Sequence, residues 1–189
     1  MTVTMEHQSP ARDGWTTDDL DALPDTERRP ELLDGVLLVP PSPTHLHQSI
    51  ALRLGALLDA SCPTDFEVSQ GVEVRLSPRR SFIPDLLLVT AVAADRNTHW
   101  FVPHEVILAI EIVSATSVSL DRITKPALYA EAGIAHYWRV ETDPELIVHT
   151  HTIDPLAKVY RETGRCTSVI DVNEPWPMKI AIDDLRRRN

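Results

Sequence analysis

The chain has 189 residues, of which 43% are hydrophobic and 24% are charged, a composition typical of soluble globular proteins. No apolar run approaches the ~20 residues that a membrane-spanning helix needs, which argues against a helical membrane protein. The formal net charge of −10 argues against a broadly basic nucleic-acid-binding surface. A nucleic-acid site would therefore need a local source of positive charge, such as a divalent cation held by carboxylates.

The cysteines and the N-terminus indicate location and domain organisation. Cys62 and Cys166 are far apart and have no metal-ligand spacing, so we expect free thiols in the reducing cytoplasm. Residues 1–14 are polar, lack a signal-peptide core and are predicted to form a flexible tail. Residues 15–189 are predicted to form a single domain.

The first third of the chain carries clear local signals. Threonine followed by two aspartates indicates a helix start, Asp-Gly indicates a hairpin turn, and apolar residues at helical spacing indicate an amphipathic helix. The predicted elements are a short helix capped by Thr16 or Thr17 and stopped by Pro24, strands 31–33 and 36–39 around Asp34-Gly35, and a helix over residues 46–60.

The rest of the chain predicts mostly strands and one longer helix. Period-two alternation and short apolar runs indicate the strands, and Gly133 is a common helix stop. In chain order the segments are "DFEVSQGVEVRLSP" as a strand pair or bulged strand, "FIPDLLLVT" and "WFVPHEVILAIEIVS" as strands, "LDRITKPALYAEAGI" as a helix, "AHYWRVE", "PELIVHTHTI" and "KVYRET" as strands, and "IAIDDLRRR" as a strand end with a short helix. This order predicts an α/β (α+β mixed) fold, with a central mixed sheet flanked by helices on both faces.

Two acidic residues stand out in the predicted strands. Glu111 lies inside an apolar strand, where a carboxylate needs a partner, and Asp85 opens the preceding strand after Pro84. If these strands are neighbours, both carboxylates and the carbonyl of Ile112 could hold Mg²⁺ together with water. The alternative is that Asp85 is a turn residue and Glu111 pairs with a buried arginine.

Lys125 is the candidate cation of this site. It stands at the start of the helix after the Glu111 strand, and a helix that packs back on the sheet returns its first turn to the strand end. A cation there could orient the attacking water or stabilise charge on the phosphoryl group. Pro126 fits only the first turn of a helix, so we expect Thr124 or Lys125 near the N-cap and an irregular turn before it. The alternative is a solvated surface lysine.

For other candidate residues, a structural role is more common than a functional one. The pairs His45/His47 and His149/His151 could bind a transition metal, but histidines in such places are more often solvated or capping groups. Aromatic residues such as Tyr137 and Trp138 could stack on bases, but packing in the core or in a dimer interface is the more common use.

An ordered set of motifs is more specific than any one of these residues. The motifs are "ELLDG" from Glu31, "HQSIALRL" from His47, "PDLLLV" from Pro84, "EIVSATS" from Glu111, "DRITKPALYAEAGI" from Asp121 and "HYWRVE" from His136. In this order they resemble the Uma-type family of restriction endonucleases, a branch of the PD-(D/E)XK nuclease superfamily. The resemblance covers the chain from about residue 15 to the C-terminus.

The resemblance implies a restriction-endonuclease-like core and a set of site residues. Asp85 would be the aspartate of the superfamily's "PD", Glu111 its second acid, and Glu31 an acid donated by the N-terminal segment. The superfamily lysine stands two residues after the second acid, where this chain has Val113; in the family the lysine is carried by the following helix, which fits Lys125. The basic residues that follow the family's "SPST" are absent after "SATS", which weakens any expectation of backbone phosphate binding.

Three functions follow as expectations. The first is a Mg²⁺- or Mn²⁺-dependent endonuclease that acts on DNA, as a homodimer, with Asp85 and Glu111 at the metal, Glu31 assisting and Lys125 stabilising. The second is a non-catalytic module that keeps the nuclease fold for binding or assembly, which the net charge and Val113 favour. The third is a nuclease for RNA or small phosphodiesters, which needs no basic duplex-binding face.

Overall fold

The computed structural model describes residues 14–23, 29–96 and 98–186, so the predicted tail lies outside the described residues except for Gly14. The helices are α1 (Thr17–Asp21), α2 (His45–Asp59), α3 (Ala91–Ala94), η1 (Pro103–Glu105), η2 (Leu120–Thr124), α4 (Lys125–Ala132) and α5 (Ile182–Leu185). The strands are β1 (Glu31–Leu33), β2 (Val36–Leu38), β3 (Phe66–Gln70), β4 (Glu73–Ser77), β5 (Arg80–Phe82), β6 (Leu86–Thr90), β7 (Trp100–Phe101), β8 (Val106–Ile112), β9 (His136–Glu141), β10 (Ile147–Asp154), β11 (Val159–Cys166), β12 (Val169–Val172) and β13 (Met178–Ala181).

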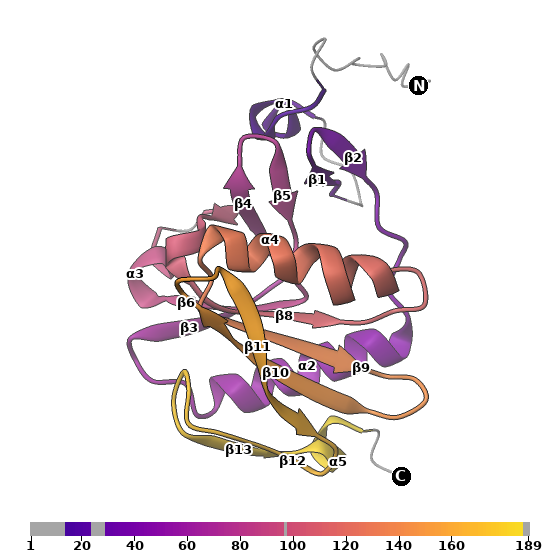
Figure 1. The fold of residues 1–189 in the computed structure, drawn as a ribbon, viewed down its shortest axis with the longest axis vertical. Coiled ribbons are helices and arrows are strands. Elements are labelled where there is room, and N and C mark those ends of the chain that lie inside the picture. Colours follow the sequence, from indigo (N-terminus) through magenta and orange to yellow (C-terminus); the bar gives the residue numbers. More distant parts are fainter. Residues whose placement is uncertain (1–13, 24–28, 97, 187–189) are drawn as a thin grey trace, which may run out of the picture.

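The centre of the fold is a six-stranded mixed sheet in the order β11-β10-β9-β8-β6-β3. The neighbours β8 and β9 run parallel and are connected through α4, while the other pairs in this sheet are antiparallel. Helix α4 lies over one face, and α2 lies on the other, near the hairpin β12–β13 (Figure 1). The predicted mixed sheet with helices on both faces is therefore confirmed.

A hydrophobic core covers each face of this sheet. On the α2 side, Leu54 packs with Ile110, Ile112 and Trp138, which are all at most 1% exposed. On the α4 side, Tyr129 belongs to a second buried cluster with residues of the strands. Because residues alternate along β8, the neighbours of Ile110 and Ile112 point to the α4 side. That alternation places Glu111 on the α4 face, beneath the helix that carries Lys125.

A second, five-stranded sheet with the order β2-β1-β5-β4-β7 supplies the N-terminal part of the site. Its β1–β2 hairpin turns at Asp34 and Gly35, whose φ angles are +51° and +84°, as the Asp-Gly signal predicted. Strand β1 pairs with β5 through Leu32 and Ser81. Since the chain passes from β5 directly to Asp85 and β6, this pairing brings Glu31 beside the start of β6.

Most predicted elements are confirmed, and several differ, including β5 and α3, which were not predicted as separate elements. Strands β3 and β4 both exist, but they lie in different sheets and do not pair, because the chain changes sheets at Gly71. The long strand predicted from Trp100 is divided into β7 and β8 by the 3₁₀ turn at Pro103. Strand β12 was not predicted, and it pairs with β13 to close the α2-side core.

The aromatic strand proposed as a dimer face lies inside the fold. Tyr137 and Trp138 are 0% and 1% exposed, and Leu146, Ile147 and Val148 are also buried. Neither segment is therefore available to a second copy or to nucleic-acid bases. The homodimer stays a prediction, without this face to support it. No helix among the described residues is long and apolar enough to cross a membrane.

Candidate active site

Asp85 sits at the junction of the two sheets, immediately before β6. Because Leu86 pairs with Ile110, Asp85 stands opposite Glu111 on the neighbouring antiparallel strand. Its Oδ2 accepts a hydrogen bond of 2.7 Å from the backbone N–H of Ile112. The carboxylate thus extends the ladder between the strands by one contact, which fixes its position relative to Glu111.

Glu111 is 2% exposed, and its contacts show which side chains stabilise a carboxylate in this apolar strand. Its Oε1 lies 3.0 Å from Nζ of Lys125 and accepts a 2.7 Å hydrogen bond from the hydroxyl of Tyr129. A lysine and a tyrosine of α4 therefore take the place of the buried arginine considered above. Both contacts are made to Oε1, which leaves Oε2 as the oxygen for any further ligand.

The start of α4 explains how Lys125 reaches the sheet. The turn before it, η2, is a π-helix, in which the N–H of Lys125 donates to the carbonyl of Leu120 five residues earlier. Pro126 stands in the first turn of α4, where its missing N–H costs nothing, and the irregular turn comes before it as predicted. Single π turns widen a helix and often occur at functional sites. Here the turn directs Lys125, which is 4% exposed, into the protein.

Glu31 reaches the same ammonium group from the second sheet. Its Oε1 lies 3.0 Å from Nζ of Lys125 and accepts a 2.9 Å hydrogen bond from the N–H of Ile83. Ile83 is two residues before Asp85 in the chain, so Glu31 also tethers the segment that positions Asp85. The structure therefore brings Glu31, Glu111 and Lys125 into direct contact, with Asp85 beside them.

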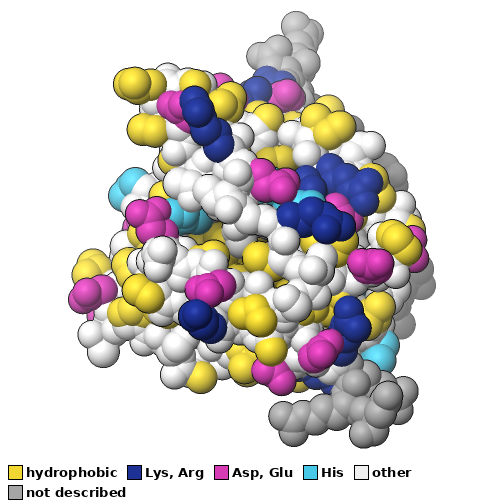
Figure 2. All heavy atoms as spheres, turned by 60° about the horizontal axis from the view of Figure 1, so that its bottom comes forward, with side chains coloured by type: hydrophobic (Ala, Val, Ile, Leu, Met, Phe, Trp, Pro, Cys, Tyr) yellow, Lys and Arg dark blue, Asp and Glu magenta, His cyan; other side chains and the backbone are white. Residues whose placement is uncertain are grey.

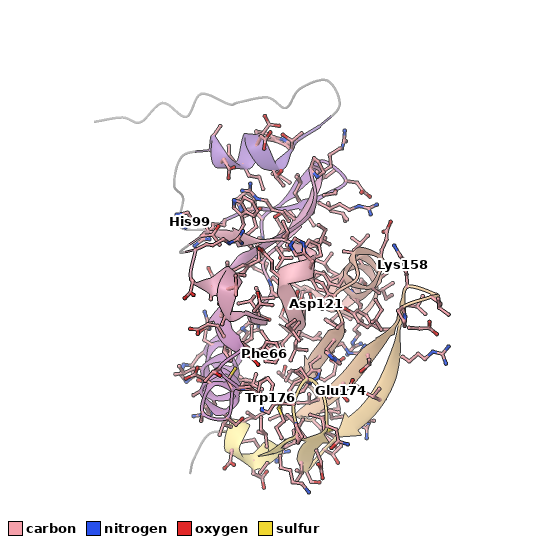
Figure 3. All side chains as sticks on the ribbon, turned by 90° about the vertical axis from the view of Figure 1, so that its left-hand side faces the viewer. Phe66, His99, Asp121, Lys158, Glu174 and Trp176 are labelled. Atoms are coloured by element: carbon pink, nitrogen blue, oxygen red, sulfur yellow. The ribbon has the colours of Figure 1, made fainter. Side chains whose placement is uncertain are left out.

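Asp121 is a fourth acid that sequence reasoning did not single out. It is 3% exposed, and its Oδ1 lies 3.7 Å from Nζ of Lys125, one helical turn later. Figure 3 shows it near the centre of the molecule, away from the stacked Phe66 and Trp176. The spacing of four between Asp121, Lys125 and Tyr129 was the available signal, because such residues share one face of a helix.

The buried charges of this cluster do not balance. Three buried carboxylates, of Glu31, Glu111 and Asp121, surround one buried ammonium group. Burial raises the pKa of Glu111 well above its ordinary value, and although Lys125 opposes this, the other acids raise it further. Burial likewise raises the pKa of Asp121. Burial alone lowers the pKa of Lys125, but the surrounding carboxylates raise it above its ordinary value. The cluster therefore carries excess negative charge whenever its acids ionise.

His47 completes the cluster from α2. Its Nε2 lies 3.1 Å from Oδ2 of Asp85, and its ring also has a backbone hydrogen bond with Ile112. Burial lowers the pKa of His47, but the hydrogen bond and the charge of Asp85 outweigh it and raise the pKa above its ordinary value. His47 is the first residue of the motif "HQSIALRL".

The donor set fits a hard divalent cation in type and number. No three His, Cys, Asp or Glu side chains among the described residues converge closely enough to hold an ion by themselves. Mg²⁺ is, however, commonly bound by one or two carboxylates, with carbonyl and water oxygens completing an octahedron. Asp85, Glu111 and the carbonyl of Ile112 match that requirement, and the excess negative charge of the cluster favours a cation.

The charge imbalance predicts that Asp121→Asn stabilises the protein without metal. Asn keeps the shape and removes one negative charge, so we expect melting a few degrees higher, since 1 kcal/mol corresponds to roughly 2–4 °C for a chain of this size. Because the pKa of Asp121 is raised on folding, its favourable contribution is complete below the unfolded pKa and is lost as pH rises through the folded value. The gain should therefore be larger at pH 8 than at pH 5, as measured by calorimetry with chelator. An equal gain at both pH values would contradict the assigned charge.

The other histidine candidates lie elsewhere. His45 contacts only its own helix, through Ser49 Oγ at 3.3 Å. His149 and His151 lie on β10, at 3.1 Å and 3.8 Å from Glu162 of the edge strand β11. The structure brings none of these three residues to the carboxylate cluster, and the pair His149/His151 stays without an assigned ligand.

Comparison with known proteins identifies the family to which the chain belongs. The family model described as "Uma2: Putative restriction endonuclease" matches residues 17–167. The chain is also similar to the crystal structure of "a putative nuclease belonging to DUF820" from Anabaena variabilis ATCC 29413, with a TM-score of 0.71 and 18% identity over 90% of this chain and 96% of that chain. No curated protein matches the chain. At this identity, the structural likeness shows a shared fold.

Proposed function

Because the chain belongs to the Uma2 family of restriction endonucleases, we propose that it is a Mg²⁺- or Mn²⁺-dependent endonuclease that hydrolyses phosphodiester bonds of DNA. The observation that carries the proposal is the convergence of Glu31, Glu111 and Asp121 on Lys125, beside Asp85. A buried, charge-rich cluster of this kind is costly to maintain and is typical of functional sites. We further propose a cytoplasmic homodimer.

Asp85, Glu111 and the carbonyl of Ile112 would hold the metal in this proposal. When bound, the cation lowers the pKa of a water molecule and neutralises charge on the phosphoryl oxygens. Asp85 is held in place by the N–H of Ile112, so its position does not depend on a flexible rotamer. Tyr129 donates a hydrogen bond to Oε1 of Glu111, so Oε2 would be the oxygen that holds the metal.

In this proposal, Lys125 supplies the positive charge of the site and Glu31 fixes its position. The ammonium group of Lys125 contacts three carboxylates, so its first role is to hold Glu31 and Glu111 in one geometry. Its positive charge is then fixed close to the reacting phosphate, where it opposes the negative charge that develops in the transition state. Glu31 orients Lys125 and links it to the Ile83 backbone.

Basic residues near Glu111 support contact with a phosphate backbone. Arg139 pairs with Glu111 across β8 and β9, and Arg122 donates two hydrogen bonds of 2.8 Å to Glu141, which Arg139 also contacts at 2.9 Å. Two arginines thus share one glutamate and leave one positive charge in excess. Elsewhere, acidic and basic side chains are mixed in small groups, as on the face in Figure 2, where no extended basic field is visible. We therefore expect few phosphate contacts.

Binding of a short DNA strand should depend only weakly on salt. With one or two phosphates neutralised, log K should fall with log salt concentration with a slope of about −1 to −2. Arg122→Gln should reduce that slope by ~1 and weaken binding about equally for all sequences. Fluorescence anisotropy in Ca²⁺ measures both quantities, with Arg186→Gln, on the C-terminal side of the fold, as control. A steep slope that Arg122→Gln leaves unchanged would place the DNA on another surface.

The proposal is tested by incubating supercoiled plasmid and short single strands of DNA and RNA with the protein and Mg²⁺ or Mn²⁺. We expect the wild type to cleave DNA, and Asp85→Ala and Asp85→Asn to cleave at least ~100-fold more slowly. The Asn variant keeps an acceptor for the Ile112 N–H, so it separates the loss of charge from a loss of folding. Cleavage of RNA alone would favour the RNA reading. No cleavage under any of these conditions would favour the non-catalytic nuclease-fold module.

A further inference from the structure

His47 is half-buried and has an unusual pattern of contacts. Its Nε2 lies 3.1 Å from Oδ2 of Asp85, and its ring also has a backbone hydrogen bond with Ile112. Its other ring nitrogen, Nδ1, is buried and has no hydrogen-bond partner among the described residues. A buried polar atom left unpaired costs about 1–3 kcal/mol. The ring is therefore held by its Nε2 side alone, with that nitrogen directed at Asp85.

Nε2 of His47 lies beside a carboxylate, which would also attract a cation. An ionised carboxylate can only accept hydrogen bonds, so Nε2 donates its proton to Oδ2 of Asp85. A divalent ion in place of that proton would have a nitrogen and a carboxylate oxygen as ligands. The same Oδ2 of Asp85 also accepts from the N–H of Ile112, which keeps the carboxylate aimed at this point.

We propose that His47 is a ligand of the metal, binding through Nε2 beside Asp85. The inference rests on the proposed function only in that a divalent cation binds at Asp85. His47 and Asp85 form the part of the site that is already assembled, whereas Glu111 is engaged by Lys125 and Tyr129. The site then has a mixed nitrogen and oxygen donor set.

A mixed donor set changes which metal is preferred. Mg²⁺ is a hard ion that takes oxygen ligands, whereas imidazole suits transition metals better. The geometry therefore predicts tighter binding of Mn²⁺ or Co²⁺ than of Mg²⁺, and this preference should depend on His47. A purely oxygen site of Asp85, Glu111 and Ile112 would discriminate much less.

The test compares Mn²⁺ binding in the wild type, His47→Gln and His45→Gln. Pulsed EPR of the Mn²⁺-loaded protein detects a bound imidazole by its ¹⁴N coupling, and calorimetry gives the affinities. His47→Gln keeps a donor for Asp85, and His45→Gln is a matched control, since His45 lies on the same helix and is exposed. We expect ¹⁴N coupling in the wild type and the control but not in His47→Gln, with Mn²⁺ affinity lower by ~10-fold or more and Mg²⁺ affinity changed less.

Two results would overturn the inference in different ways. If Mn²⁺ binds in an Asp85-dependent manner but without ¹⁴N coupling, or if the coupling persists in His47→Gln, then His47 is not a ligand while the proposed metal site survives. If no divalent ion binds, or if Asp85→Asn does not change binding, then the metal site of the proposed function fails and the role of His47 fails with it.

Discussion

Lys125→Met should reduce DNA cleavage by ~100-fold or more, a loss on the order of 3 kcal/mol in transition-state stabilisation. It should also lower the free energy of unfolding by about 3–5 kcal/mol, because it leaves buried carboxylates without their counter-charge. The side chain is 4% exposed, and its ammonium group lies 3.0 Å from both Glu31 and Glu111. Met keeps the stem and removes the charge. Single-turnover cleavage and chemical denaturation measure the two effects.

A control and a double variant separate the two effects of this change. Lys179 is an exposed lysine that pairs with Asp171 at 2.9 Å, so Lys179→Met should change neither cleavage nor melting appreciably. Adding Asp121→Asn to Lys125→Met removes one of the unpaired acids and should recover stability but not cleavage. If Lys125→Met cleaves DNA as fast as the wild type, the lysine has no part in the reaction and only its structural role remains.

Local signals in the sequence predicted the individual elements well. The Asp-Gly turn and the position of Pro126 each depend on backbone preferences of one or two residues, and both are found as expected. Pairing partners are not encoded locally. The period-two pattern of β3 and β4 says which side chains share a face, but it does not say that Gly71 lets the chain leave one sheet for another. The 3₁₀ turn at Pro103 was not predicted from the sequence, because the apolar pattern continues on both sides of it.

The candidate site was predicted in part, for a comparable reason. Asp85 and Glu111 were recognisable because an acid in an apolar strand needs a partner. Lys125 was recognisable from its place at the start of the helix after the Glu111 strand, and Glu31 followed from the resemblance to the family. Asp121 was missed because an aspartate near a helix start is ordinarily a solvated residue favoured by the helix dipole. Its burial depends on the π turn of η2, which turns this face of the helix inward. No local pattern predicts such a turn.

Val113 occupies the strand position from which a lysine could have supplied the positive charge beside Glu111. It lies two residues after Glu111 on β8's extension, where the superfamily carries its lysine, and it is buried with 6% exposure. Lys125 delivers its charge to Glu111 from α4 instead, and Tyr129 secures the contact. In the proposed site, the helix supplies the positive charge that a strand residue supplies in the superfamily, and Lys125 must be buried to reach Glu111.

Glu111→Gln should abolish most of the stabilisation that Mn²⁺ gives to the wild type. A ligand at 100 times its dissociation constant stabilises a folded protein by about 2.7 kcal/mol, or roughly 5–10 °C in Tm for a chain of this size. The variant loses one of the two proposed acidic ligands but keeps a side chain of the same shape next to Tyr129. Differential scanning calorimetry with increasing Mn²⁺ measures the shift. Cleavage should fall at least ~100-fold, as for the loss of any group that stabilises the transition state.

Without metal, Glu111→Gln should be more stable than the wild type at neutral and higher pH. Because the pKa of Glu111 is raised on folding, its contribution to stability is complete below the unfolded value near 4.5 and is lost as pH rises through the folded value. Gln does not ionise, so its advantage should grow with pH, offset in part by a weaker contact with Lys125. Glu67 is an exposed glutamate of β3, and Glu67→Gln should respond to Mn²⁺ as the wild type does. If Glu111→Gln shows the full Mn²⁺ shift, then Glu111 is not a ligand, and Asp85 with His47 must hold the ion without it.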